Sequence, residues 1–347
     1  VINISNAYKE DKKFSFGESF IKHNFSDNTF LRLGQYYKDF SNYLNDELSS
    51  GSMLVSNNAQ PMPKIGFVSS QNIKKVIFHF GISHGFFNKN EYYTEAPFLH
   101  EKFLYMNINK NNHQIGIGLV HEAIWAGATP DLGTLPKTLK DFLKIVLSED
   151  GADDGGSHPN ALGSHLGIWD FYYSYRYEND KLLKLYYQHF FEDTSSLRFR
   201  NEIDGLWGIE LENYNISFLI EYLDTTHSDL DPPYQADTYY WNYQYQDGWR
   251  YKKNIIGNPY VNPERGWNGV YGHEQLKVIH LGFSGKINNN FEYQIKSSRR
   301  ININDNIVYK IKMKRIINNN FIFNIFMANN KEQNGVGIGI SYIFKTK

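Results

Sequence analysis

The sequence predicts a large antiparallel β-barrel that crosses a membrane with about sixteen strands. Apolar and polar side chains alternate along many stretches, and several of these reach the roughly nine to eleven residues that a tilted strand needs to cross a bilayer. Short Asn-rich turns and long connections follow one another in alternation, as in barrels with hairpins at one end and loops at the other. No run of about 18 apolar residues occurs, which excludes a transmembrane helix.

Residues 166–177 show the alternation most clearly. One set of positions holds Trp169, Phe171, Tyr173, Tyr175 and Tyr177, and the other holds Ile168, Asp170, Tyr172, Ser174 and Arg176. A period of two places the two sets on opposite faces of a strand. Aromatic side chains form girdles at the lipid interfaces of membrane barrels, so we expect the first set to face lipid and the second to face the interior.

The remaining strands are expected from the same pattern. Asn and Asp tolerate the positive φ of tight turns, and such residues occur at 110–112, 178–180, 288–290 and 318–320. The candidate strands lie near residues 14–20, 28–36, 51–55, 62–68, 76–86, 101–108, 113–121, 166–177, 181–190, 206–211, 214–223, 277–287, 290–298, 305–314, 321–329 and 336–345. The longer connections cover residues 87–100, 122–161, 191–205, 224–275, 299–304 and 330–335.

One segment breaks the alternation. Residues 136–147 begin with Pro136 and carry apolar side chains at 139, 142, 143, 146 and 147, which is helical spacing. We therefore expect a short helix inside a long extracellular loop, lying across the barrel mouth or folded into the barrel.

Composition excludes several classes of protein. The 347 residues contain no cysteine, which rules out disulfides, thiol catalysis and Cys-ligated metals. A net charge of -1 argues against an electrostatic nucleic-acid binder. The chain starts at Val1 without an initiator methionine, so we expect a mature or truncated form that builds a single barrel domain over residues 1–347.

Several longer motifs run in order along the chain, at residues 50–53 (SGSM), 56–63 (SNNAQPMP), 99–102 (LHEK), 159–170 (PNALGSHLGIWD), 187–193 (YQHFFED), 204–208 (DGLWG) and 256–259 (IGNP). These motifs resemble those of a known family, the Wzi-type capsule-assembly outer-membrane proteins, and in particular its Bacteroidetes branch. The resemblance implies an eighteen-stranded barrel in the outer membrane of a Gram-negative bacterium that helps to hold capsular polysaccharide in a lectin-like manner. Family members have more chain before the region of Val1, so N-terminal strands are incomplete here or merged in our count. The resemblance carries over no functional residue.

The connection at 224–275 is the candidate glycan-binding region. Sugars stack their C–H faces on aromatic rings while carboxylates and amides hold their hydroxyl groups. The candidate residues are Tyr239, Tyr240, Trp241, Tyr243, Trp249, Asp237, Asp247 and Trp267. The alternative is that these rings pack the loop into a plug or form the upper girdle, which is the usual place for aromatic residues in such barrels.

A charged cluster lies between two candidate strands. It consists of Glu192, Asp193, Arg198, Arg200, Glu202 and Asp204, which we expect to form salt bridges in the polar lumen. A glycosidase would need two of these carboxylates at a defined separation, which the sequence does not give. Twelve histidines and many serines make a chance Ser-His-acid arrangement certain, so a lipase or deacylase is a weak alternative.

The acidic stretch at 149–158 lacks the spacing of a calcium-binding loop, so we expect no metal and no cofactor. The combined prediction is a monomeric, non-enzymatic outer-membrane barrel whose partners are capsular or other surface polysaccharide and outer-membrane lipid. A porin or a glycan export channel is the alternative, and an outer-membrane hydrolase is a third. The helix and the 224–275 connection favour a plugged interior over an open channel.

Overall fold

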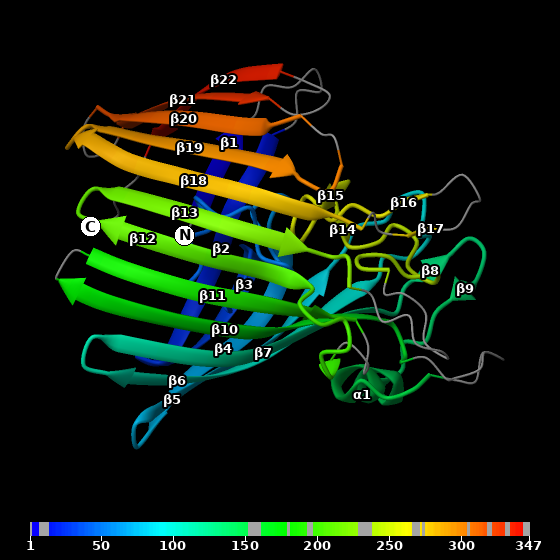
Figure 1. The fold of residues 1–347 in the computed structure, drawn as a ribbon. Coiled ribbons are helices and arrows are strands. Elements are labelled where there is room, and N and C mark those ends of the chain that lie inside the picture. The colour runs from blue at the N-terminus through cyan, green and yellow to red at the C-terminus, as the bar shows by residue number, and fades with distance from the viewer. Residues whose placement is uncertain are drawn as a thin grey trace.

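Sixteen strands form one continuous antiparallel sheet that curves around an inner space, the lumen (Figure 1). The computed structural model describes residues 2–6, 14–151, 161–178, 181–192, 197–227, 238–265, 271–272, 275–303, 306–317, 321–329 and 334–342. Each strand of the sheet pairs with its nearest sheet neighbour along the chain, so β7 pairs with β10 and β13 with β18. The strands β1 and β22 end the sheet, and no pairing joins them within the described residues.

The elements alternate between long strands and connections of unequal length. The strands of the large sheet are β1 (Ile2–Asn6), β2 (Phe14–Ser26), β3 (Thr29–Tyr36), β4 (Met62–Ile73), β5 (Val76–Phe86), β6 (Phe98–Lys110), β7 (His113–Trp125), β10 (Ser164–Glu178), β11 (Lys181–Phe191), β12 (Gly205–Asn213), β13 (Ile216–Asp224), β18 (Lys277–Asn288), β19 (Phe291–Arg300), β20 (Val308–Ile316), β21 (Phe321–Asn329) and β22 (Asn334–Tyr342). The connections contain α1 (Leu139–Leu147), β8 (Ala128–Thr129), β9 (Gly133–Thr134), β14 (Arg250–Tyr251), β15 (Asn254–Ile255), β16 (Glu264–Arg265) and β17 (Tyr271–Gly272).

Short turns gather at one end of the strands and long connections at the other, which confirms the expected alternation. In Figure 1 the hairpins lie at the left, and α1 with the small strand pairs β8–β9, β14–β15 and β16–β17 lies at the right. We call the right-hand end the loop end. Among the described residues, no helix combines the length and the hydrophobicity needed to cross a bilayer.

The two faces of the sheet differ as the alternation predicts. On β6, the outward side chains of Leu104, Met106 and Ile108 are 46–47% exposed, whereas the inward side chains of Phe103 and Tyr105 are buried. On β10 the inward positions are buried up to residue 174, and the outward aromatic residues remain partly accessible. The outer surface of the sheet is therefore an apolar band suited to lipid.

Fifteen of the sixteen candidate strands coincide with strands of the sheet, but the strand expected at 51–55 is wrong. That stretch lies in the connection between β3 and β4, and its place in the count of sixteen is taken by β1. A short apolar run cannot be assigned to a strand from its pattern alone, because a buried irregular segment shows the same composition. The helix expected over residues 136–147 is present as α1, but it begins at Leu139, so Pro136 precedes it and does not lie in its first turn. Thr138 is the N-cap and forms a capping box with Asp141.

Candidate functional site

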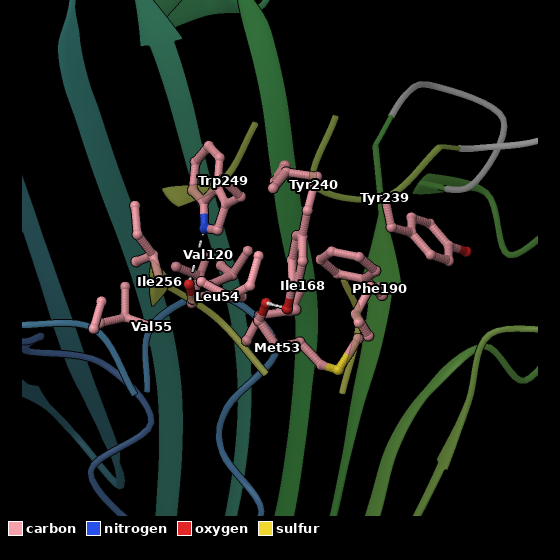
Figure 2. Close-up of a cluster of buried hydrophobic side chains, with 14 of the residues drawn as sticks. Met53, Leu54, Val55, Val120, Ile168, Phe190, Tyr239, Tyr240, Trp249 and Ile256 are labelled. Atoms are coloured by element: carbon pink, nitrogen blue, oxygen red, sulfur yellow. Dashed lines mark hydrogen bonds between the residues drawn. The ribbon is translucent and has the colours of Figure 1, made fainter. Parts of the chain in front are cut away.

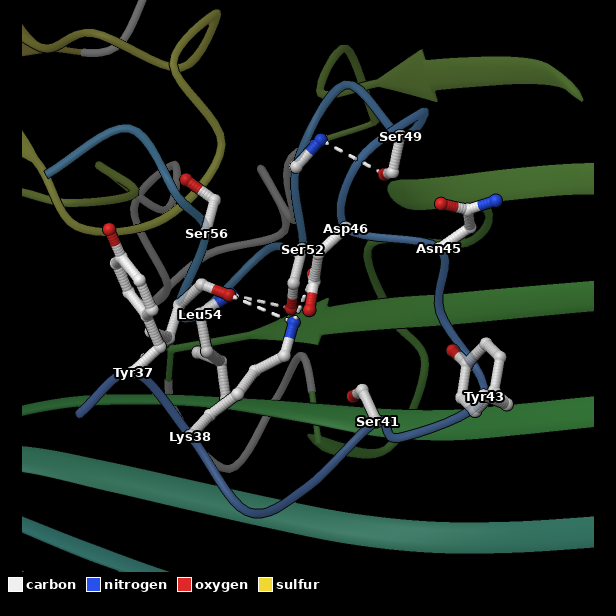
Figure 3. A network of polar contacts seen from close by, with 12 residues as sticks. Tyr37, Lys38, Ser41, Tyr43, Asn45, Asp46, Ser49, Ser52, Leu54 and Ser56 are labelled. Atoms are coloured by element: carbon white, nitrogen blue, oxygen red, sulfur yellow. Dashed lines mark hydrogen bonds and ion pairs between the residues drawn. The ribbon is translucent and has the colours of Figure 1, made fainter. Parts of the chain in front are cut away.

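The connection between β3 and β4, residues 37–61, folds into the lumen, and we call it the inner segment. Lys38 holds it in a compact form: its Nζ donates hydrogen bonds to the Asp46 carboxylate at 2.6 Å and to the Val55 carbonyl at 3.3 Å (Figure 3). The Gly51 amide closes a tight bend by donating to Ser49 Oγ at 3.0 Å. An irregular segment at this depth is tolerated because its polar groups are satisfied inside the protein.

Asp170, on the inward face of β10, is the first anchor of the inner segment. Its carboxylate is fully buried and accepts hydrogen bonds from Ser41 Oγ at 2.6 Å and from the Tyr43 hydroxyl. The Tyr105 hydroxyl of β6 donates to the same carboxylate at 2.6 Å. Because hydrogen bonds to a charged acceptor are about twice as strong as neutral ones, this buried carboxylate holds two residues of the inner segment firmly.

The next strands add further anchors on the same inward face. Glu221 of β13 accepts from Ser49 Oγ and from the Ser50 amide, both at 2.6 Å. Gln188 of β11 accepts from the Met53 amide at 3.0 Å. Two more side chains complete the row: Glu210 of β12, which accepts from Asn45, and His280 of β18, which bonds to the Leu48 carbonyl. This row was not predicted from the sequence, although polar residues at the inward positions of five adjacent strands indicate it.

The connection at 238–265 covers the inner segment from the loop end. The Tyr240 hydroxyl donates to the Met53 carbonyl, and Trp249 Nε1 donates to the Leu54 carbonyl at 3.0 Å (Figure 2). Asn258 Nδ2 donates to the Gly51 carbonyl at 2.7 Å. The aromatic rings of this connection and the apolar side chains of the inner segment thereby form one buried core above the lumen.

This packing corrects part of the expected glycan-binding set. Tyr239, Tyr240 and Trp249 are at most 1% exposed, so they offer no ring face to a ligand and instead build the plug. Trp241 is half-buried, and Tyr243 is 43% exposed. Asp247 is half-buried. Asp237 and Trp267 lie outside the described residues.

Two connections meet at the surface of the loop end around Asp247. Asn90 Nδ2, from the connection between β5 and β6, donates to the Asp247 carboxylate at 2.6 Å. Tyr92 follows in the same turn, and its amide donates to Asn90 Oδ1 at 2.9 Å. Tyr243 lies four residues before Asp247 with its ring partly in solvent. We call Asn90, Tyr92, Tyr243 and Asp247 the surface patch, since it combines aromatic rings with an amide and a carboxylate.

The charged cluster does not form in the lumen, so the expected arrangement is wrong. Arg198, Arg200 and Glu202 are exposed on the connection between β11 and β12. Glu192 is half-buried and accepts a hydrogen bond from the Thr238 amide at 2.9 Å. Asp204 alone is fully buried, and Asp193 lies outside the described residues. The exposed members of the set therefore lie on the surface of the connection and not in the lumen.

Asp204 is part of a different group, together with Asp224 and His227. Their ligand atoms lie within 4.8 Å of one another, a spacing that could hold a metal ion. Both oxygens of Asp204 already accept hydrogen bonds, from the Tyr239 hydroxyl at 2.8 Å and from the His227 amide at 2.9 Å. The group therefore works as a hydrogen-bond centre that ties the connections after β11 and β13 together. Burial raises the pKa of Asp204 to about 6.

We expect the local stability of the connection before β12 to depend on pH through the protonation of Asp204. Its folded-state pKa lies above the ordinary value of 3.8, so the stability given by the protonated form is present at low pH and is lost as pH rises through about 6. Hydrogen exchange of residues 201–204, corrected for the intrinsic rate, should show stronger protection at about pH 5 than at about pH 7.5. The Asp204→Asn variant should lose the difference. Equal pH dependence in both proteins would contradict this assignment.

A family model described as capsule assembly protein Wzi matches residues 3–273. The chain belongs to this family. Its fold is also similar to the solved structure described as Wzi, an outer-membrane protein involved in group 1 capsule assembly in Escherichia coli and a carbohydrate-binding β-barrel. That match has a TM-score of 0.57 at 13% identity and covers 96% of this chain and 70% of that chain.

Two further structures resemble this Wzi-family chain less. They are the toluene transporters TodX of P. putida, with a TM-score of 0.29 at 9% identity covering 83% of this chain and 84% of that one, and TbuX of Ralstonia pickettii, with a TM-score of 0.31 at 12% identity covering 91% and 89%. No curated protein matches. The family and the barrel fold place the protein in the outer membrane of a Gram-negative bacterium.

The Wzi-family motifs of the sequence meet in space. Residues 50–53 and 56–61 belong to the inner segment, and residues 256–259 dock on it from the loop end. The Ser56 amide donates to the Ile256 carbonyl at 2.8 Å, and Ser56 Oγ donates to the Gly257 carbonyl at 2.6 Å. Three of the motifs that suggested the family thus contact one another where the lumen is filled.

Proposed function

We propose that this Wzi-family barrel binds capsular polysaccharide at the cell surface and holds it there without chemical conversion. Membership of the capsule-assembly family is the observation that carries the proposal. The carbohydrate-binding description of the E. coli structure, which shares the fold, supports it. We further infer a single barrel domain that works as a monomer embedded in outer-membrane lipid. Assignment to the Bacteroidetes branch rests on the sequence motifs alone.

We assign the glycan contact to the surface patch. The exposed ring of Tyr243 offers a face for the C–H surface of a sugar, and Tyr92 adds a second, partly accessible ring. Asn90 and Asp247 supply an amide and a carboxylate for sugar hydroxyls, and their mutual hydrogen bond fixes both in place before binding. Half-buried Trp241 lies two residues from Tyr243 and could extend the surface.

The filled lumen favours binding over transport. An open porin needs a continuous aqueous path, whereas here the inner segment bonds to the inward faces of β10, β11, β12, β13 and β18. The proposal that the protein is not an enzyme is supported by the surroundings of the carboxylates that a glycosidase would have used. Glu202 is exposed, and Asp204 is engaged by Tyr239 and His227.

The proposal predicts that a strain lacking this gene makes capsule polymer and sheds it into the medium. Complementation with the wild-type gene should return the polymer to the cell-associated fraction. Normal capsule retention in the deletion strain would overturn the proposed function.

Removing the ring of Tyr243 should weaken binding of purified capsular polysaccharide to the purified protein. A stacked ring contributes about 1 kcal/mol, so Tyr243→Ala should lower the affinity about fivefold, and combining it with Asp247→Ala should lower it further. Tyr177→Ala is the matched control, because Tyr177 is 42% exposed, close to the 43% of Tyr243, but lies at the opposite, hairpin end of β10. Equal affinities of both single variants would exclude the surface patch as the contact.

A further inference from the structure

The helix α1 packs on the outer wall of the barrel, neither across its mouth nor inside it as the sequence analysis expected. Its Phe142 ring lies 5.1 Å from the Trp125 ring and 5.5 Å from the His100 ring, measured between centroids. Ile145 is fully buried in a small cluster with Ala123 and Trp125, separate from the core above the lumen. The partners belong to β6 and β7, so one face of α1 covers the ends of these strands.

The covered strand positions continue the lipid-facing register. On β6 the outward positions run from Met106 and Leu104, which are about half exposed, to Lys102 and then His100. Lys102 Nζ donates a hydrogen bond to the Val146 carbonyl at the C-terminal end of α1. Neighbouring positions on the same face of a strand lie about 7 Å apart. The region covered by α1 therefore begins about 7 Å beyond Leu104, the last exposed apolar residue of the outward face of β6. The helix therefore lies at the upper edge of the surface that contacts lipid.

Polar residues make up much of the wall beneath α1. His84 and His100 contact the Phe142 ring, and His121 lies 3.2 Å from Ser148 Oγ just after the helix. Together with Lys102, these side chains would face the lipid boundary if the helix were absent. Polar and charged side chains at that level are costly, which gives α1 a reason to stay attached.

The opposite face of α1 carries leucines and lysines in adjoining stripes. Leu139, Leu143 and Leu147 are 76%, 53% and 65% exposed and follow one another at four-residue spacing. At roughly 100° per residue, Lys140 and Lys144 fall beside this stripe on the side away from the wall. Lys140 is exposed, and Lys144 is partly buried and also donates a hydrogen bond to the Asp150 carbonyl at 2.9 Å. An apolar stripe next to a basic stripe is the pattern of helices that lie in a membrane interface.

We propose that α1 is an interfacial anchor that inserts its leucines into the outer-leaflet lipids while its lysines meet anionic head groups. The occupant is lipid because the leucine stripe continues the apolar band of the barrel and the lysines complement negative head groups. This anchoring fixes how deeply the loop end sits above the membrane. It is independent of the proposed glycan binding.

The absence of cysteine allows a direct test with single-cysteine labels. An environment-sensitive dye is attached to Leu143→Cys in the full chain, reconstituted in nanodiscs of phosphatidylcholine and phosphatidylglycerol. Leu132→Cys is the matched control, because Leu132 is 51% exposed in the same connection but lies outside the helix. We expect the dye at position 143 to be quenched by doxyl-labelled lipid and to show roughly threefold less quenching by aqueous iodide than the dye at position 132.

Equal iodide quenching at the two positions would overturn the anchor. Protection from iodide without quenching by the labelled lipid would also overturn it, since protein rather than lipid would then cover the stripe. A second variant tests the attraction between the lysines and anionic head groups. Lys140→Glu should reduce the quenching by labelled lipid at position 143 in discs that contain phosphatidylglycerol and leave it unchanged in discs of pure phosphatidylcholine. An equal effect in both lipids would refute the role of anionic head groups.

Discussion

Replacing the Asp170 and Glu221 carboxylates with alanine is expected to open the lumen to ions. Asp170→Ala removes the acceptor of the Tyr43 and Tyr105 hydroxyls and the shorter hydrogen bond of Ser41. Glu221→Ala removes the acceptor of the Ser49 hydroxyl. A buried donor left unpaired costs about 1–3 kcal/mol, so the loss of two of the five wall anchors should loosen the inner segment strongly. The sixteen-stranded ladder is untouched, and the barrel should still assemble.

Planar-bilayer recordings measure this effect directly. The wild-type protein should give a closed baseline, and the double variant should give stepwise openings, because barrels of this strand number leave an aqueous channel when nothing fills them. Glu212→Ala is the matched control: Glu212 lies on β12 beside Lys184, two residues from the anchor Glu210, and is partly solvent-accessible. Openings in the control as well would mean that any loss of lumenal charge disturbs the barrel.

A silent double variant would also be informative. It would show that the cover formed by residues 238–265 holds the inner segment without help from the wall. Hydrogen exchange at residues 41–53 separates the two cases, because loss of the anchors should raise exchange there even where the cover keeps ions out.

The strands were predictable because their determinants are local. The period of two along residues 166–177 reports directly which side chains face lipid, and the structure places Ile168 and Asp170 inside as expected. The hairpin turns were predictable for the same reason, since Asn and Asp supply the turn conformations themselves. The stretch at 51–55 resembled a strand because its composition is that of any buried segment.

The site was less predictable because its contacts join distant parts of the chain. Ser41 meets Asp170 across 129 residues, and Trp249 meets Leu54 across 195 residues. Nothing near Trp249 in the sequence distinguishes a ring that packs a plug from a ring that stacks on sugar. The position of α1 did leave a signal, since Lys102 and His100 interrupt an otherwise apolar lipid-facing register on β6.

Gly257→Val should separate the cover from the inner segment. A Cβ atom at Gly257 would lie 2.3 Å from the Tyr240 hydroxyl and 2.5 Å from the Met53 carbonyl oxygen, which are the two partners of a hydrogen bond. Overpacking a tightly filled site costs about 1–3 kcal/mol, and here the loss falls on the contact that closes the lumen. We expect a lower midpoint of thermal unfolding, measured by the change in electrophoretic mobility of the heated barrel.

Gly335→Val provides the control, because a Cβ atom at Gly335 meets nothing within 4 Å. Unchanged stability of both variants would mean that the cover shifts freely, and the surface patch would then lack a rigid base. The surface patch depends on that base, since Tyr243 and Asp247 belong to the same connection as Tyr240 and Gly257. A destabilised Gly257→Val protein should therefore also bind capsular polysaccharide more weakly, although position 257 is buried and cannot touch the glycan.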